Sequence, residues 1–276
     1  MSEFLQIMFQ PFMACLILTG IHAYLGLHVI ERGVIFVDLA LAQVAAFGAT
    51  AGFLWGFALH TNQNYFISLG FTLLGAATFA ATRLRKPLVP QEALVGIVYA
   101  VAAAAAVLVL SRAPEGGEEL KNLMVGHLLF VDWPEILKIF VLYTLVGIVH
   151  WLVRKPLLQI SQNPDEAFAK GRHVRWWDFL FYATFGIVVT SSVELAGVLL
   201  VFSFLIVPSV CAVFLAKRIG ARLLIGWLTG VLTSVAGVAA SYFWDLPTGA
   251  AVVCAFGVCL ILCSALRGIC RLGPAV

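Results

Sequence analysis

The feature that most constrains this chain is a series of apolar runs, each about 20 residues long, which recur from residues 4–29 almost to the C-terminus. Runs of this length can cross a bilayer as α-helices. Closed β-barrels also satisfy their backbone in lipid, but their strands alternate polar and apolar residues, and this chain does not. The 276 residues are 62% hydrophobic and 11% charged, whereas soluble domains are about half apolar and about a quarter charged. The sequence therefore predicts an all-α, polytopic membrane helix bundle.

Nine membrane spans are predicted, and together they form one transmembrane domain that covers residues 1–276. They lie near residues 4–29, 34–57, 65–82, 91–110, 135–153, 176–191, 194–216, 220–243 and 248–266. The span 176–191 is short, and the region 191–208 can also be interpreted as a broken or re-entrant helix. Eight spans are therefore the alternative to nine.

The basic residues indicate the orientation of the spans, because cytoplasmic loops of membrane proteins are enriched in Lys and Arg. Fourteen of the 17 fall in one alternating set of loops and ends: Arg32, Arg83, Arg85, Lys86, Arg154, Lys155, Lys170, Arg172, Arg175, Lys217, Arg218, Arg222, Arg267 and Arg271. The other set of loops holds Arg112, Lys121 and Lys138. This split places the N-terminus outside the cell and the C-terminus inside.

Small residues and cysteines are interpreted structurally. Gly48 and Gly52 form a G-x-x-x-G motif, as do Gly226 and Gly230, and such pairs let helices pack closely. The six cysteines lack metal-finger spacing. Cys259 and Cys263 can share a helix face, but we interpret all six as small buried hydrophobic residues.

A carboxylate inside an apolar span marks the first candidate site. Asp38 lies near the start of residues 34–57, and Gln43 follows five residues later. A buried acid in lipid is stabilised by a partner, a cavity or a passing cation. The alternative is that Asp38 interacts with the helix N-terminus near the membrane edge. Five residues turn an ideal helix by about 500°, so Asp38 and Gln43 point about 140° apart unless a bulge reunites them.

Two further residues are candidates for the same pathway. Glu194 begins an apolar run and can either bind a cation at the outer mouth or remain a solvated interfacial acid. His22 lies within the first span, where a neutral histidine bonded to a backbone carbonyl is the alternative to a pathway role.

The cytoplasmic segment 161–173 contains a predicted short helix. Asn163 is a favourable N-cap, Pro164 suits the first helical position, and Gly171 ends the helix. A short capped helix facing the cytosol is either a docking element or a connector.

The chain resembles the permease subunits of the zinc, manganese and iron ABC importers over nearly its whole length. The motifs are Val29-Ile30-Glu31-Arg32-Gly33 before Phe36-Val37-Asp38, the helix Asp165-Glu166-Ala167-Phe168-Ala169-Lys170-Gly171, Gly197-Val198-Leu199-Leu200-Val201 followed by Leu205-Ile206-Val207-Pro208, Ser241-Tyr242, and Pro247-Thr248-Gly249-Ala250. The family commonly has a histidine four residues after the aspartate. Here that position is Ala42, and Gln43 is the nearest counterpart. Glu194 stands where a neutral polar residue is usual.

The resemblance implies a transport subunit of the bacterial plasma (inner) membrane, with a divalent metal ion as substrate and no permanently bound cofactor. It implies a homodimer with the path at its interface, an extracytoplasmic metal-binding protein and a cytosolic ABC ATPase. Asp38 is the predicted residue for metal capture, and Gln43, Glu194 and His22 are weaker candidates for the metal pathway. Coupling to the ATPase falls to Asp165, Glu166, Ala167, Phe168 and Gly171, with Phe168 as the aromatic anchor. Because the chain has no Walker A pattern, ATP hydrolysis is expected on a partner chain.

Three alternatives compete with this hypothesis. An intramembrane enzyme would need a nucleophile with a base or an H-E-x-x-H motif, and the sequence shows neither. An ion-coupled secondary carrier would typically show internal repeats with broken helices at matched positions. A permease for a chelated metal or vitamin is the related alternative, with a longer chain and a wider path.

Overall fold

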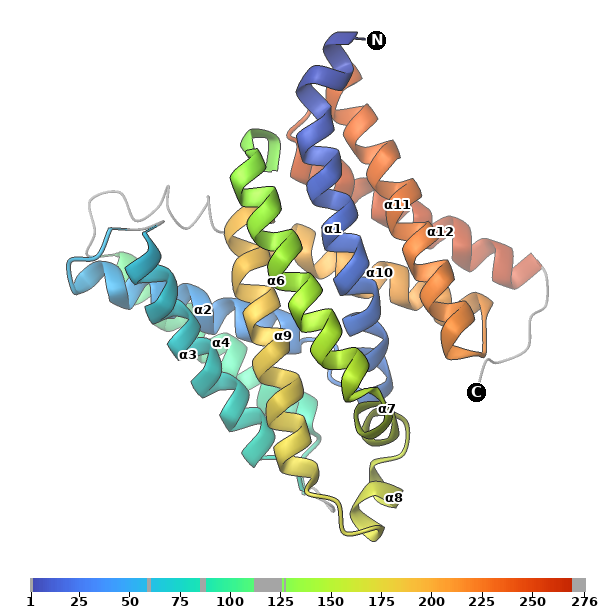
Figure 1. Cartoon of the computed structure of the whole chain (residues 1–276). Helices are drawn as coiled ribbons and strands as arrows, with labels where there is room; N and C mark the ends of the chain where they lie inside the picture. Colours follow the sequence, from blue (N-terminus) through green and yellow to red (C-terminus); the bar gives the residue numbers. More distant parts are fainter. Residues whose placement is uncertain (1, 59–60, 85–87, 112–125, 127, 270–276) are drawn as a thin grey trace. The chain divides into compact units, whose positions relative to one another are not determined.

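The computed structural model describes residues 2–58, 61–84, 88–111, 126 and 128–269, and in them the chain is helical with no strand (Figure 1). The helices are α1 (Ser2–Arg32), α2 (Val37–Leu54), α3 (Asn62–Ala81), α4 (Gln91–Leu110), the 3-10 helix η1 (Leu128–Phe130), α6 (Trp133–Leu152), α7 (Arg154–Gln162), α8 (Pro164–Ala169), α9 (Val174–Ala196), α10 (Val198–Leu215), α11 (Ile219–Trp244) and α12 (Thr248–Ile269).

Nine helices in the described part of the chain are long and apolar enough to cross a membrane. The shortest, α2 and α10, have 18 residues each, which corresponds to a length of about 27 Å. This confirms the predicted all-α membrane bundle, with nine spans rather than eight.

The predicted break near residues 191–208 falls at Gly197. Helix α9 continues to Ala196, five residues beyond the predicted end of its span, and α10 begins at Val198. Gly197 has φ +77° and ψ 159°, a backbone conformation that is essentially restricted to glycine. Gly197 therefore separates α9 from α10, and the region 191–208 forms parts of two helices.

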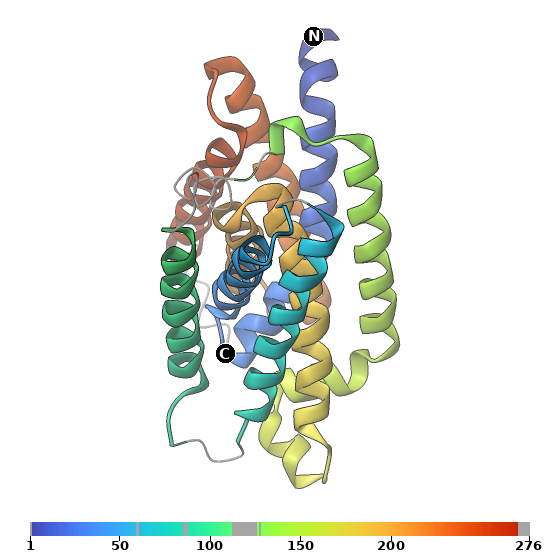
Figure 2. The same cartoon turned by 90° about the vertical axis from the view of Figure 1, so that its left-hand side faces the viewer.

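The chain divides into two compact units. Unit 1 comprises Met1–Ile30, Val125–Thr144 and Leu195–Val276, and unit 2 comprises Glu31–Met124 and Leu145–Glu194. In unit 2, α2 packs between α3 and α4 (Figure 2). A Cβ at Gly48 would lie 2.9 Å from the Cα of Ser68, so this glycine permits the close approach of α2 and α3.

In unit 1, α10, α11 and α12 pack against one another. The second glycine pair, Gly226 and Gly230, lies on α11 and faces α1. A Cβ at Gly226 would lie 3.4 Å from that of Ala23, and Gly230 lies directly against Thr19. Both G-x-x-x-G motifs therefore serve packing within one chain, as predicted.

The predicted short helix in the cytoplasmic segment is α8. The side-chain oxygen of Asn163 accepts a hydrogen bond from the N–H of Glu166 at 3.3 Å, Pro164 is the first helical residue, and Gly171 has φ +68°. The preceding helix, α7, was not predicted. Its buried residues Leu157, Ile160 and Ser161 follow helical spacing, which was the available signal.

Candidate functional site

Asp38 is the second residue of α2, and its side chain is almost completely buried. The residue is 1% exposed, and its Oδ1 has no hydrogen-bond partner among the residues that the structure describes. The helix N-terminus can stabilise an anion at this position. Oδ1 of this carboxylate is therefore not engaged by any residue that the structure describes.

The start of α2 is capped from another helix. The backbone N–H of Phe36 donates a 3.0 Å hydrogen bond to Oε1 of Glu92, which lies in the first turn of α4. Helices α2 and α4 therefore begin at the same end of unit 2. Because Glu92 serves this backbone donor, Asp38 is not needed for it.

Gln43 does not join Asp38 on one face of α2. The helix is continuous from Val37 to Leu54, without a bulge, so the five-residue spacing places the two side chains about 140° apart. Gln43 is also buried, with 7% of its surface exposed, but on a different side of α2 from Asp38. A single-chain site made by both residues is not formed in this arrangement.

Glu194 lies near the end of α9, at a different level of unit 2 from Asp38. Leu41, one turn after Asp38, approaches Gly186 on α9, and Glu194 lies eight residues, about 12 Å, further along that helix. Glu194 is half-buried and close enough to Tyr65 of α3 to act on it electrostatically. Asp38 and Glu194 therefore do not form one site.

His22 belongs to unit 1 and is fully buried. Its Nδ1 lies 2.8 Å from the backbone carbonyl oxygen of Leu18, and its ring packs against that of Tyr143. This is the arrangement expected for a structural histidine, the alternative to a pathway role.

A cluster of charged residues occupies the end of unit 2 where α2 and α4 begin. The arginine–aspartate cluster consists of Arg32, Arg83 and Asp178. Arg32 forms an ion pair with Asp178 in which both side chains are fully buried, and Nε of Arg83 lies 3.5 Å from the other oxygen of Asp178. Arg32 also donates a 2.9 Å hydrogen bond to Ser161 of α7 and lies 4.0 Å from the centroid of the Phe181 ring.

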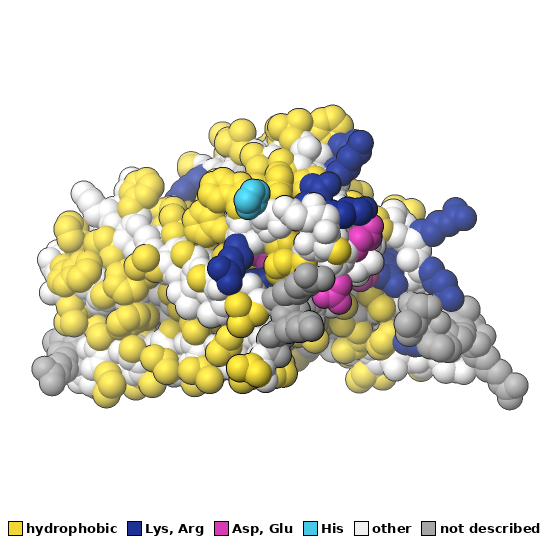
Figure 3. All heavy atoms as spheres, turned by 90° about the horizontal axis from the view of Figure 1, so that it is seen from below, with side chains coloured by type: hydrophobic (Ala, Val, Ile, Leu, Met, Phe, Trp, Pro, Cys, Tyr) yellow, Lys and Arg dark blue, Asp and Glu magenta, His cyan; other side chains and the backbone are white. Residues whose placement is uncertain are grey.

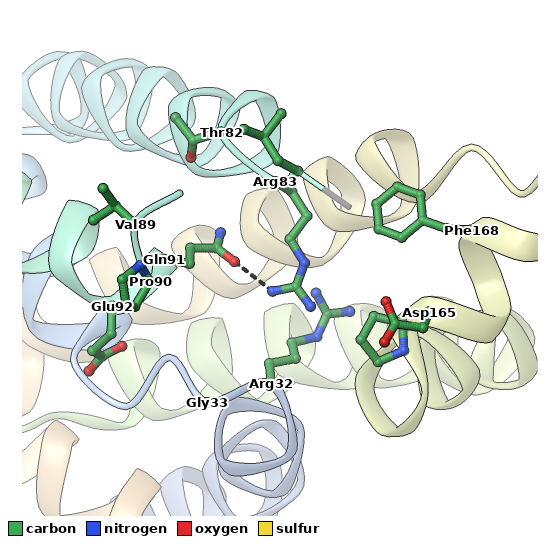
Figure 4. Close-up of a pocket in the computed structure, with 12 residues that line it drawn as sticks. Arg32, Gly33, Thr82, Arg83, Val89, Pro90, Gln91, Glu92, Asp165 and Phe168 are labelled. Atoms are coloured by element: carbon green, nitrogen blue, oxygen red, sulfur yellow. Dashed lines mark hydrogen bonds between the residues drawn. The ribbon is translucent and has the colours of Figure 1, made fainter. Parts of the chain in front are cut away.

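Arg32 and Arg83 of the cluster line a pocket of about 330 Å³ between α8, the ends of α1 and α3 and the start of α4 (Figure 4). Arg83 reaches across it and donates a 2.5 Å hydrogen bond to Gln91 at the start of α4. Asp165 and Phe168 line the side formed by α8, and Glu92 lines the opposite side. Residues of four separate segments thus meet around one pocket.

Helix α8 presents its acids outward and packs its apolar side on the chain. Asp165, Glu166 and Gly171 are exposed, and charged side chains gather on the face where α8 lies (Figure 3). Ala167 is fully buried with Ile160 and Val174, and Phe168 is half-buried against them. Of the five residues predicted for coupling, Ala167 can therefore act only by holding α8 in place.

Sequence reasoning did not find the arginine–aspartate cluster. Arg32 and Asp178 are 146 positions apart, and Arg32 was interpreted as a residue of a basic loop. The available signal was Asp178 itself, a single acid just inside an apolar span, which required a buried cationic partner.

Comparison with known proteins agrees with this geometry. The profile of the ABC 3 transport family matches residues 4–267. The manganese transport system membrane protein MntC of Halalkalibacterium halodurans is 22% identical over 244 residues, covering 88% of this chain and 82% of that protein. The chelated iron transport system membrane protein YfeC of Yersinia pestis is 22% identical over 237 residues, covering 86% and 78%. The solved structure of PsaBC from Streptococcus pneumoniae in complex with Fab superposes with a TM-score of 0.77 at 19% identity, covering 95% of this chain and 91% of that one.

Proposed function

Because the chain belongs to the ABC 3 transport family, we propose that it is the permease subunit of an importer that carries a divalent transition-metal ion, manganese or iron. As a member of this family with nine candidate spans in its described part, the chain is an integral protein of the plasma membrane and a transport subunit rather than an enzyme. The choice of manganese or iron is supported by the relatives MntC, a manganese transport system membrane protein, and YfeC, a chelated iron transport system membrane protein.

The observation that carries the proposal is the environment of Asp38. An ionised carboxylate in an apolar helix is unfavourable unless a cation or dipole compensates it. Oδ1 of Asp38 is buried without a hydrogen-bond partner in the described residues. Carboxylate oxygen is a ligand that manganese accepts, and a single carboxylate per chain binds weakly enough to release the ion.

Two copies of the chain would strengthen the site. In a homodimer with the path at its interface, each copy would contribute one Asp38 from inside its own bundle, so the dimer would hold two carboxylates. Glu194, near the opposite end of unit 2, would then attract the ion after its delivery by an extracytoplasmic metal-binding protein.

The energy would come from ATP hydrolysis on a separate cytosolic subunit that docks against α8. Asp165 and Glu166 are exposed, Asp165 where α8 borders the pocket, while buried Ala167 fixes α8 to α7 and α9. Arg32 would link α8 and its neighbours to the segment that carries Asp38. It binds Ser161 of α7 and Asp178 of α9, and it lies five residues before the start of α2, where Asp38 sits.

Reconstitution with the ATPase tests this function. The chain and the ATPase are incorporated into proteoliposomes, and ATP-dependent transport of Mn²⁺, Fe²⁺ and Zn²⁺ is measured separately. Transport of Mn²⁺ or Fe²⁺ is expected, and Asp38→Asn should raise the metal concentration that it requires about tenfold or more, because losing about 1.4 kcal/mol of binding weakens affinity tenfold.

Asp245→Asn is the matched control. It makes the same chemical change at an exposed residue that ends α11 with φ +50°, a conformation that asparagine tolerates. Wild-type transport by Asp38→Asn would end the proposed role of Asp38, whereas transport of Zn²⁺ alone, or of a chelate alone, would contradict the proposed substrate.

A further inference from the structure

Three cysteine thiols converge in unit 1. The Sγ atoms of Cys211, Cys259 and Cys263 all lie within 4.8 Å of one another, and no other group of three metal-binding side chains lies so close in the part of the chain described. Cys211 is on α10, and the other two are one turn apart on α12. The sequence placed Cys259 and Cys263 on one helix face, and the fold adds the third thiol from a helix that packs against it.

The spacing of the sulfur atoms fits a metal ion with little rearrangement. A zinc–sulfur bond is about 2.3 Å, so three sulfurs around one ion lie about 4 Å apart. The thiols would therefore need to close by less than about 1 Å, which rotation of such short side chains can supply. If the cysteines served only as small hydrophobic residues, their packing would not require the three sulfur atoms to lie this close together.

We propose that Cys211, Cys259 and Cys263 form a thiolate site for a soft divalent cation of the Zn²⁺ type. Thiolates select soft and borderline ions, whereas Mn²⁺ prefers oxygen ligands, so this site would be distinct from that of Asp38. Binding would release three protons, one from each thiol, and the resulting complex would carry one net negative charge.

An arginine lies at the same end of α12 as the cysteine cluster. Arg267 follows Cys263 by one turn of α12, and its guanidinium lies 4.9 Å from the centroid of the Phe214 ring, three residues after Cys211. A positive charge is thus held at the same junction of α10 and α12.

The burial of the thiols suits a site that holds its ion. Cys211 is fully buried, Cys263 is 9% exposed, and Cys259 is half-buried. Cys211 lies four residues, about 6 Å, before the end of α10. A bound ion would tie α10 to α12.

Metal titration of the full-length chain tests the proposal. The chain, purified in detergent under reducing conditions, is titrated with Co²⁺ and then with Zn²⁺. We expect a sulfur-to-cobalt charge-transfer absorption that saturates at one ion per chain and is abolished when Zn²⁺ displaces Co²⁺. Each of Cys211→Ser, Cys259→Ser and Cys263→Ser should weaken binding about tenfold or more, since even the loss of an outer-shell group has effects of that size.

Cys254→Ser is the control, because Cys254 lies on the same helix α12 but is exposed and outside the cluster. Unchanged absorption in a triple Cys211, Cys259 and Cys263 variant, or loss of absorption in Cys254→Ser, would overturn the proposal. These readouts measure binding alone, so they are independent of which ion the chain transports.

Protection of the wild-type thiols provides a measurement that does not depend on a variant folding. Mass spectrometry of peptides measures the alkylation rate at each cysteine. Zn²⁺ should slow alkylation of Cys211, Cys259 and Cys263 and leave the rate at Cys254 unchanged. It should also raise the unfolding temperature, because the ion binds the folded chain. Equal alkylation rates with and without Zn²⁺ would contradict the site.

Discussion

Arg32 and Asp178 form an ion pair in which neither side chain is exposed, although the residues are 146 positions apart in the sequence. The pair joins the end of α1 to the start of α9 and belongs to the arginine–aspartate cluster. Arg32 also contacts α7 through a hydrogen bond to Ser161. Arg32 also packs on the Phe181 ring at 4.0 Å. The position of Arg32 is therefore fixed by contacts with two helices.

Removing one partner of this pair should destabilise the chain strongly. Asp178→Asn leaves the buried charge of Arg32 without its counter-ion, which typically costs about 3–5 kcal/mol. Thermal unfolding of the detergent-purified chain measures the loss. The double variant Arg32→Gln with Asp178→Asn should recover part of it, because the fully buried charge of Arg32 is then removed and only Arg83, which is partly exposed, loses its partner.

The exposed ion pair between Lys170 and Glu166 is the control for that prediction. Its nitrogen–oxygen distance is 2.5 Å, and the side chains are 58% and 45% exposed. Solvent screens such pairs, so Lys170→Gln should change stability by about 1 kcal/mol or less. Equal effects of Lys170→Gln and Asp178→Asn would show that burial does not decide the strength of these pairs.

Reversing a charge on α8 should weaken binding of the ATPase without unfolding the chain. Asp165 is exposed, and Asp165→Lys places a cation at a helix N-terminus, which costs about 0.3–1 kcal/mol. ATPase that co-purifies with the chain should fall severalfold. Glu3→Lys makes the same reversal at an exposed residue in the first turn of α1 and should leave the recovered ATPase unchanged. Equal recovery with both variants would argue that α8 is only a connector.

A side chain at Gly197 should strain the junction of α9 and α10. With φ +77° and ψ 159°, the residue lies in a region that other residues reach at a cost of about 1–3 kcal/mol. Gly197→Ala should lower stability by that amount in thermal unfolding. Gly20→Ala, in helix α1 with no atom within 4 Å of the added Cβ, should be neutral or stabilising.

A methyl group at Gly48 should push α2 away from α3. The added Cβ would lie 2.8 Å from Cβ of Phe71 and 2.9 Å from Cα of Ser68, and such overpacking costs about 1–3 kcal/mol. Gly70→Ala on α3 is the matched control, since nothing lies within 4 Å of its added Cβ. Similar stability of the two variants, measured by thermal unfolding, would mean that the helices separate there at no cost.

Local signals in the sequence predicted most of the fold. Apolar runs of bilayer length predicted the spans, and Asn163, Pro164 and Gly171 predicted the short helix α8 through capping chemistry that acts within a few residues. Gly48 was correctly assigned to packing because close helix contacts in lipid need small residues.

Features that depend on tertiary contacts were not predicted. Neither the pairing of Arg32 with Asp178 nor the approach of Cys211 to Cys263 can be derived from spacing, because each joins helices far apart in the sequence. The relation of Asp38 to Gln43 was predictable, since an uninterrupted helix fixes it. The roles of Asp38, Gln43, Glu194 and His22 in metal transport stay predictions.

The contact of Phe36 with Glu92 has a consequence for biosynthesis. The backbone N–H of Phe36 meets its acceptor on a residue 56 positions later, at the start of α4. While the chain is being made, α2 leaves the ribosome before that acceptor exists. The first turn of α2 therefore lacks this acceptor until α4 has been made, so the segment bearing Asp38 depends on a later helix for its final form.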